Sequence, residues 1–208
     1  SYVCSECGYK TPKWMGKCPK CGNWNTFDEQ TKETVTSSFV KRPSSSVIGG
    51  GEASRLKMVK TNSSERIVTG ITEYDRVMGG GIVKDSVSII TSPPGGGKST
   101  LALTIASKTA EQGLKILYAS GEESEGQIKN RILDGINENI WILSTVSMNS
   151  VIAEVDKIDP DIIIVDSIQT FALEEFYPSR AGNPTQTMEC AGALVHIAKG
   201  GKRPRAVI

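Results

Sequence analysis

A glycine-rich run ending in lysine, SPPGGGKST over residues 92–100, carries the clearest chemistry in the sequence. The pattern G-x-x-x-x-G-K-[ST] forms a phosphate loop, in which backbone N–H groups at a helix N-terminus surround the phosphates of a nucleotide. Lys98 would reach the β- and γ-phosphates, and the Ser99 hydroxyl would bind Mg²⁺. Ser92 departs from the pattern because it occupies the position of the first glycine. The residues expected to contact the nucleotide are Pro94, Gly95, Gly96, Gly97, Lys98, Ser99 and Thr100.

Two carboxylates downstream could complete a magnesium-dependent ATP site. The β-branched run 162–165 predicts a buried parallel strand, and Asp166 at its end suits a contact to Mg²⁺. Hydrolysis also needs a group that orients and deprotonates water. Glu122 and Glu123 follow the predicted strand 115–120, which could neighbour the strand before the glycine-rich loop. We favour Glu122, although both could be solvated carboxylates at a helix start. The candidate catalytic residues are Lys98, Glu122 and Asp166.

The segment after Asp166 could sense the nucleotide and contact a nucleic acid. Ser167 and Gln169 could sense the γ-phosphate, so Gln169 joins the nucleotide-binding residues. A polar stretch at 171–187 follows, at the carboxyl end of the predicted sheet, where loops are often functional. Arginine and amide groups can contact phosphates or bases and aromatic rings can stack on bases, whereas two glutamates at 174–175 would repel a phosphate backbone. The candidate DNA-binding residues are Tyr177, Arg180, Asn183 and Gln186.

Four of the five cysteines form two C-x-x-C pairs, Cys4 with Cys7 and Cys18 with Cys21, with ten residues between the pairs. Two such pairs supply four thiolates for tetrahedral Zn²⁺, and the repeated spacing favours zinc over the competing redox interpretation. With four cysteine ligands no position stays open for a substrate, so the site would be structural. Lysines interleave here with aromatic residues, which suits nucleic-acid contact as well as aromatic packing over the metal.

The elements that must position these residues alternate between strand and helix. Strands are predicted at 87–90, 115–120, 140–144 and 161–166, and helices at 101–108, 127–133, 150–158 and 185–198. A further short helix, 72–78, would be capped by Thr72. This alternation predicts an α/β core with a mostly parallel sheet and flanking helices, with ligands at the carboxyl ends of the strands. Residues 205–208 resemble the start of one more strand, so we expect the core to be incomplete at its C-terminal end.

Composition sets the outer limits. The 208 residues carry a formal net charge of +1, which gives no overall signal for nucleic-acid binding. No apolar run approaches the roughly 20 residues of a membrane span, and paired cysteines of this kind suit a reducing compartment, so we expect a cytoplasmic protein. We predict a zinc-binding module at 1–30, a flexible Ser/Gly-rich linker at 31–65 and the ATPase core at 66–208.

Several motifs together resemble the RadA (Sms) family of bacterial DNA repair proteins, which are RecA-like P-loop ATPases. The four-cysteine segment 4–24 is similar to that family's zinc module, and residues 69–82 are similar to the entry of its ATPase core. The sequences SGEES at 120–124 and VDSIQT at 165–170 match its acidic and second phosphate-site segments. The chain departs from the family at Ser92, where glycine is usual, and at Gly96, where a larger residue is usual. The family's K-N-R-F-G motif and Lon-protease-like domain are absent.

The resemblance implies a DNA-dependent ATPase of homologous recombination and repair that acts as a ring-forming motor on single-stranded or branched DNA. It implies ATP or ADP, Mg²⁺ and Zn²⁺ as cofactors, a homo-hexamer, and RecA or other recombination proteins as partners. It also implies that Glu122 activates water and that 171–187 is the first DNA-binding loop, with slow turnover expected for this chain alone. The alternative is a KaiC-like nucleotide-switched module that binds a protein partner, but KaiC-like proteins lack the four-cysteine segment. A small-molecule kinase is weaker still, because no acceptor-binding lid is evident.

Overall fold

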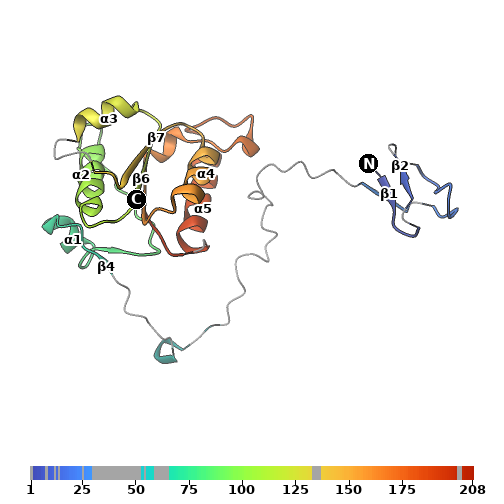
Figure 1. Cartoon of the computed structure of the whole chain (residues 1–208), viewed down its shortest axis with the longest axis horizontal. Coiled ribbons are helices and arrows are strands. Elements are labelled where there is room, and N and C mark those ends of the chain that lie inside the picture. Colours follow the sequence, from blue (N-terminus) through green and yellow to red (C-terminus); the bar gives the residue numbers. More distant parts are fainter. Residues whose placement is uncertain are drawn as a thin grey trace. The chain divides into compact units, whose positions relative to one another are not determined.

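The computed structural model describes residues 2–7, 9–11, 13, 15–24, 26–29, 53, 55–58, 66–132, 137–200 and 203–208. The chain divides into two compact units, Ser1–Ser54 and Arg55–Ile208, and each is described by itself (Figure 1). Most of the predicted linker, 31–65, lies outside the described residues, except for a 3₁₀ turn, η1 (Leu56–Met58). The boundaries at 30 and 65 therefore stay predictions.

The smaller unit is built on a three-stranded antiparallel sheet in the order β2-β1-β3. Its strands are β1 (Tyr2–Cys4), β2 (Lys10–Thr11) and β3 (Phe27–Glu29). The second cysteine pair closes a tight turn, in which the Gly22 N–H donates to the Cys18 carbonyl at 2.9 Å. Gly22 has a φ of 78°, a conformation that glycine adopts without strain. The turn thereby holds Cys18 and Cys21 of the second pair close together.

The larger unit contains a four-stranded parallel sheet in the order β7-β6-β8-β9. Its strands are β6 (Ile116–Ser120), β7 (Ile140–Ser144), β8 (Ile162–Asp166) and β9 (Ala206–Val207). The main helices are α2 (Lys98–Ala110), α3 (Glu125–Arg131), α4 (Met148–Ile158) and α5 (Pro184–Gly200). The predicted α/β fold with a mostly parallel sheet is confirmed.

Helices cover both faces of this sheet. Successive residues of β6 enter opposite cores: Ile116 and Tyr118 pack with α2, whereas Leu117 and Ala119 pack with α4 and α5. In Figure 1 the green helix α2 lies on one side of the strands and the orange and red helices α4 and α5 on the other. Because all four strands are parallel, their carboxyl ends share one edge, where ligands bind in folds of this class.

The segment before the glycine-rich loop differs from its prediction. Instead of a full strand at 87–90, it makes one parallel bridge, from Val87 to Val207 of β9. Ile89, two residues further on, has no strand partner among the described residues and is 79% exposed. The expectation that 115–120 neighbours this segment is also wrong, because β8 and β9 lie between them.

The entry to the core is an antiparallel pair, β4 (Arg66–Ile67) and β5 (Ile82–Val83), around the short helix α1 (Thr72–Val77). The N-cap of α1 is Ile71, not the predicted Thr72. The local polar contacts come from Asp75 instead, whose carboxylate accepts hydrogen bonds from the backbone N–H groups of Thr69 and Gly70 at 3.0 and 2.9 Å. The glycine triplet 79–81 forms a turn, and all three glycines have positive φ.

Two arginines near the end of the chain, Arg203 and Arg205, form ion pairs. Arg203 contacts Asp159 at 3.1 Å and Asp161 at 2.5 Å, and Arg205 contacts Asp159 at 2.6 Å. Arg205 is only 3% exposed. These pairs join the segments before β8 and β9 at the sheet edge opposite the glycine-rich loop. They therefore stabilise the pairing of these two strands. No helix among the described residues is long and apolar enough to cross a membrane.

Candidate nucleotide site and metal centre

The glycine-rich loop leads directly into α2, whose first residue is Lys98. Gly95 and Gly97 have φ values of 74° and 80°, which turn the backbone in a way that glycine permits without strain. No side chain caps the helix, so the N–H groups of its first turn are left for an anion. The Lys98 ammonium folds back over the loop and donates to the Ser92 carbonyl at 3.1 Å. The loop therefore has the donors of a phosphate cradle.

Asp166 ends β8, directly opposite Ser120 at the end of β6. The Tyr118 hydroxyl donates to Asp166 Oδ2 at 2.8 Å from a side chain that is fully buried. Burial and the neighbouring Asp166 charge raise the pKa of Tyr118, which keeps the phenol protonated as a donor. Sequence reasoning missed Tyr118. The signal that could have found it is a polar hydroxyl group within an otherwise apolar strand, two residues before the strand ends at the candidate site.

The two candidate water-activating carboxylates have different surroundings. Glu122 Oε1 accepts a hydrogen bond from the Ser167 hydroxyl at 3.1 Å, which joins it to the residue after Asp166. Glu123 instead forms an ion pair with Arg131 at 2.5 Å. The Glu123 carboxylate is thus held by a cation of α3, whereas Glu122 lies beside the end of β8. This contrast favours Glu122 as the water-activating residue.

The backbone at Gly121, just before Glu122, lies very close to the 3₁₀ turn η2 (Ile168–Thr170). A Cβ at Gly121 would overlap the Thr170 side chain, so only glycine leaves room for η2 at this point. The Gly121 N–H also donates to the Asp166 carbonyl at 3.1 Å. Gln169, in the middle of η2, is exposed. Glu122, Asp166 and Gln169 are thus brought to one edge of the sheet.

The predicted DNA-binding stretch 171–187 is more ordered than a polar loop. It contains the 3₁₀ turn η3 (Glu174–Phe176), and α5 already begins at Pro184. Phe171 and Leu173 are buried in the core under α5. Gln186 is fully buried, and its amide bonds to both backbone groups of Leu173 at 2.8 and 3.0 Å. Gln186 holds the segment in place and is withdrawn from the candidate DNA-binding residues.

The other three DNA candidates remain at the surface. Tyr177 is 86% exposed, and Arg180 and Asn183 are also exposed. The Asn183 side chain accepts a hydrogen bond from the Thr185 N–H at 2.9 Å at the start of α5, so part of its function is to cap that helix. Tyr177 and Arg180 are the members of the set with a stacking ring and a cationic group available to a ligand.

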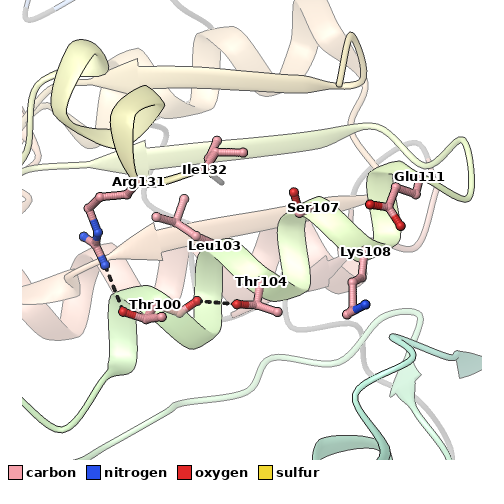
Figure 2. Close-up of a pocket in the computed structure, with 8 residues that line it drawn as sticks. All are labelled: Thr100, Leu103, Thr104, Ser107, Lys108, Glu111, Arg131 and Ile132. Carbon is pink, nitrogen blue, oxygen red and sulfur yellow. Dashed lines mark hydrogen bonds between the residues drawn. The ribbon is translucent and has the colours of Figure 1, made fainter. Parts of the chain in front are cut away.

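A cavity of about 130 Å³ lies along α2, from Thr100 near the start of the helix to Glu111 just beyond its end (Figure 2). Arg131 reaches across it and donates to the Thr100 hydroxyl at 3.1 Å. Sequence reasoning missed this cavity because its two walls lie 31 residues apart in the chain. It is lined by Thr100, Leu103, Thr104, Ser107, Lys108, Glu111, Arg131 and Ile132.

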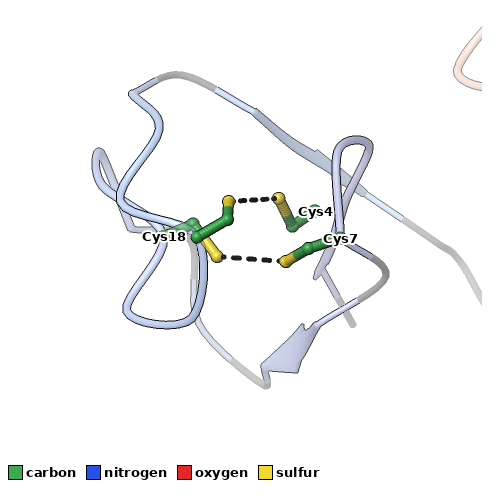
Figure 3. Close-up of side chains that lie close together, drawn as sticks. Cys4, Cys7 and Cys18 are labelled. Atoms are coloured by element: carbon green, nitrogen blue, oxygen red, sulfur yellow. Dashed lines mark hydrogen bonds between the residues drawn. The ribbon is translucent and has the colours of Figure 1, made fainter.

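The four cysteines of the small unit converge, with all Sγ atoms within 4.8 Å of one another (Figure 3). Cys4 lies 3.7 Å from Cys21, and Cys7 lies 3.6 Å from Cys18, measured between Sγ atoms. A tetrahedral zinc ion with Zn–S bonds of about 2.3 Å requires S···S distances of about 3.8 Å, so the cluster fits this metal. The Thr26 hydroxyl lies 3.2 Å from Cys4 Sγ, and this contact lowers the pKa of Cys4 to about 6.

One aromatic residue of this unit is not packed over the cysteines. Trp24 is 69% exposed, and the Lys17 ammonium lies 5.5 Å from the centre of its ring. The cysteine cluster is covered instead by Tyr2 and Met15. Trp14, the other tryptophan of this segment, lies outside the described residues.

Comparisons with known proteins agree with both parts of this description. A zinc-ribbon family model, described as a rubredoxin metal-binding domain, matches residues 2–29. An ATPase family model, described as KaiC, matches residues 67–139. Over 200 residues the chain is 37% identical to the DNA repair protein RadA of Bacillus subtilis (strain 168), covering 95% of this chain and 43% of the relative. The chain is a RadA homologue.

Other RadA proteins show the same extent of similarity. The protein of Aquifex aeolicus is 38% identical over 210 residues, which cover 100% of this chain and 45% of the relative. That of Campylobacter jejuni is 39% identical over 200 residues, which cover 95% and 44%. The chain thus spans less than half the length of the relatives it matches. This RadA homologue joins a four-cysteine zinc-ribbon site to a KaiC/RecA-like ATPase domain.

Proposed function

We propose that the chain is the nucleotide-binding part of a DNA-dependent ATPase that acts in homologous recombination and repair. The contact between the Ser167 hydroxyl and Glu122 carries this proposal. It joins a carboxylate that can activate water to the strand end that holds Asp166, at the sheet edge reached by the Lys98 loop. A lysine, a magnesium-binding carboxylate and a water-activating carboxylate are the groups that ATP hydrolysis requires.

Each residue has a distinct task in this proposal. The loop N–H groups and Lys98 bind the β- and γ-phosphates of ATP, and the Ser99 hydroxyl and Asp166 hold Mg²⁺. Glu122 orients and deprotonates the attacking water, while Gln169 senses the γ-phosphate. The cavity beside Thr100 suits the nucleoside, because the Arg131 guanidinium can lie against the face of a base. ATP and ADP are therefore the ligands we expect.

The DNA-binding part is proposed for the exposed end of the 171–187 segment. Tyr177 can stack on a base and Arg180 can bind a phosphate, with Asn183 beside them. The short turn η2 connects this segment to Asp166, so a movement at the γ-phosphate can reach the DNA contacts through few residues. The relatives' name, DNA repair protein, supports DNA as the partner, and we propose single-stranded or branched DNA. By the same analogy we infer a homo-hexamer, RecA or other recombination proteins as partners, and a place in the cytoplasm.

The cysteine cluster is proposed to hold one structural Zn²⁺. Four thiolates leave no open coordination position, so the metal would stabilise the fold of the small unit without taking part in a reaction. A rubredoxin-type family description leaves iron as the competing metal, and metal analysis of the purified chain distinguishes the two.

A KaiC-like switch that binds a protein partner remains the second candidate, favoured by the KaiC description of the matching ATPase model. The relatives that match almost the whole chain are DNA repair proteins, which favours DNA. The test is ATP hydrolysis and DNA binding with increasing single-stranded DNA, with Arg180→Ala as the variant and Lys199→Ala, an exposed charge on α5, as the control. The proposal is supported if single-stranded DNA stimulates ATP hydrolysis and if Arg180→Ala, but not Lys199→Ala, weakens this stimulation. Nucleotide-dependent capture of a protein with no DNA binding would favour the switch.

A further inference from the structure

The glycine-rich loop departs from the pattern G-x-x-x-x-G-K-[ST] at its first position, where Ser92 replaces glycine. A glycine is required where the backbone has a positive φ. Ser92 is not among the residues with positive φ, so its backbone accepts a side chain without strain. The backbone conformation therefore permits serine at the first position of the loop. The remaining constraint is whether the loop has room for the serine side chain.

The reason for glycine at position 96 differs from the reason at positions 95 and 97. Gly95 and Gly97 have positive φ and open space around them, whereas the φ of Gly96 is not positive. A Cβ at Gly96 would lie 2.5 Å from Ser92 Oγ, 2.9 Å from Ser92 Cβ and 3.0 Å from the Pro93 carbonyl oxygen. Two of these three contacts are too short, and both are with the Ser92 side chain. Position 96 is thus closed to a side chain by sterics and not by its backbone conformation.

The Ser92 side chain also lies next to the catalytic lysine. Lys98 Nζ is 3.5 Å from Ser92 Oγ and 3.1 Å from the Ser92 carbonyl oxygen. The Ser92 hydroxyl itself donates to the Pro93 carbonyl at 3.1 Å. The space shared by positions 92 and 96 therefore lies beside the Lys98 ammonium.

We propose that Ser92 and Gly96 are a compensating pair: the loop has room for one side chain at these two positions, and in this chain Ser92 supplies it. Ser92 is then a positioning residue for Lys98 and not a defect of the loop. The functional part of this inference rests on the proposed nucleotide site. The steric part does not, because it concerns only the fold of the loop.

The test is a double-mutant cycle of Ser92→Gly, Gly96→Ala and the two combined, measured in the 208-residue chain with a fluorescent ATP analogue and magnesium. Gly96→Ala inserts a methyl group against Ser92, and overpacking of this kind weakens binding by about tenfold or more. Removing the Ser92 side chain should recover at least about threefold of that loss, the remaining contact with Pro93 keeping recovery incomplete. Additive losses in the combined variant would overturn the proposal.

Two further glycines provide matched controls. Gly95→Ala meets no atom within 4 Å but strains a positive φ, so Ser92→Gly should not rescue it. Gly192→Ala, on α5 in open space, should bind as the unmodified chain does. The same cycle is measured by thermal unfolding without nucleotide. If the unmodified chain fails to bind the analogue, the proposed function fails, while rescue of the melting temperature still decides whether the two positions compensate.

Discussion

Tyr118 offers the sharpest test of how the magnesium site is held, because its hydroxyl donates to Asp166 at 2.8 Å from a fully buried side chain. Tyr118→Phe removes only this oxygen and leaves the ring in the core. The Asp166 carboxylate then loses a fixed donor that orients it toward the position proposed for Mg²⁺. The phenylalanine variant should fold, because no cavity larger than the hydroxyl is left.

The size of the effect follows from the kind of bond that is lost. A hydrogen bond to a charged group contributes about 1.5–3 kcal/mol, but Asp166 is half-buried, so water can replace part of it. Loss of an outer-shell partner of a metal ligand typically costs about 10–100-fold in metal affinity or activity, and the partial exposure of Asp166 points to the lower end, about tenfold. We therefore expect about ten times more Mg²⁺ to be needed for half-maximal ATP hydrolysis.

The assay is ATP turnover at increasing Mg²⁺ concentration for the unmodified chain and the variant. Tyr74→Phe is the control, since the Tyr74 hydroxyl is buried and has no hydrogen-bond partner among the described residues. It should leave the Mg²⁺ dependence unchanged. If Tyr118→Phe and Tyr74→Phe both titrate like the unmodified chain, the Tyr118 contact does not orient a magnesium ligand and the reasoning fails.

Three other changes test separate parts of the structure. Glu122→Gln should retain ATP binding and abolish single-turnover hydrolysis, whereas Glu123→Gln, which breaks the pair with Arg131, should hydrolyse ATP; the reverse result would transfer the catalytic function to Glu123. Gln186→Ala removes a buried amide that bonds to Leu173 and should lower the free energy of unfolding by about 2–3 kcal/mol in urea denaturation; a loss of DNA affinity at unchanged stability would restore Gln186 as a DNA contact. Cys21→Ser should lower the zinc content of the purified chain from one ion to well below one, and full retention of the metal would refute the four-cysteine assignment.

Local patterns predicted the sheet well. The strand at 140–144 is placed as predicted, and the β-branched run before Asp166 forms the central strand β8. Both segments are rich in residues with high strand propensity, and the run at 162–164 is also buried. The capping box at Ser124 likewise explains why α3 begins earlier than the predicted 127.

Features that depend on distant contacts could not be predicted in this way. Tyr118 and Asp166 are 48 residues apart, and Arg205 meets Asp159 across 46 residues. Gln186 was predicted to be a surface residue because its side chain is polar and lies in a polar stretch. In the structure its amide is buried and bonds to the backbone of Leu173. Which strands lie beside β6 depends on the order of strands in the sheet, and the spacing of residues along the chain does not determine that order.

The central claim is that the Lys98 loop binds the phosphates of ATP, and equilibrium binding of a fluorescent ATP analogue with Mg²⁺ tests it most directly. The unmodified chain should bind, and Lys98→Ala should weaken binding by at least about 100-fold, because a charge-assisted contact to the β- and γ-phosphates is lost. Lys157→Ala, which changes an exposed lysine on α4, should bind like the unmodified chain. Equal binding by Lys98→Ala and the unmodified chain would contradict the account.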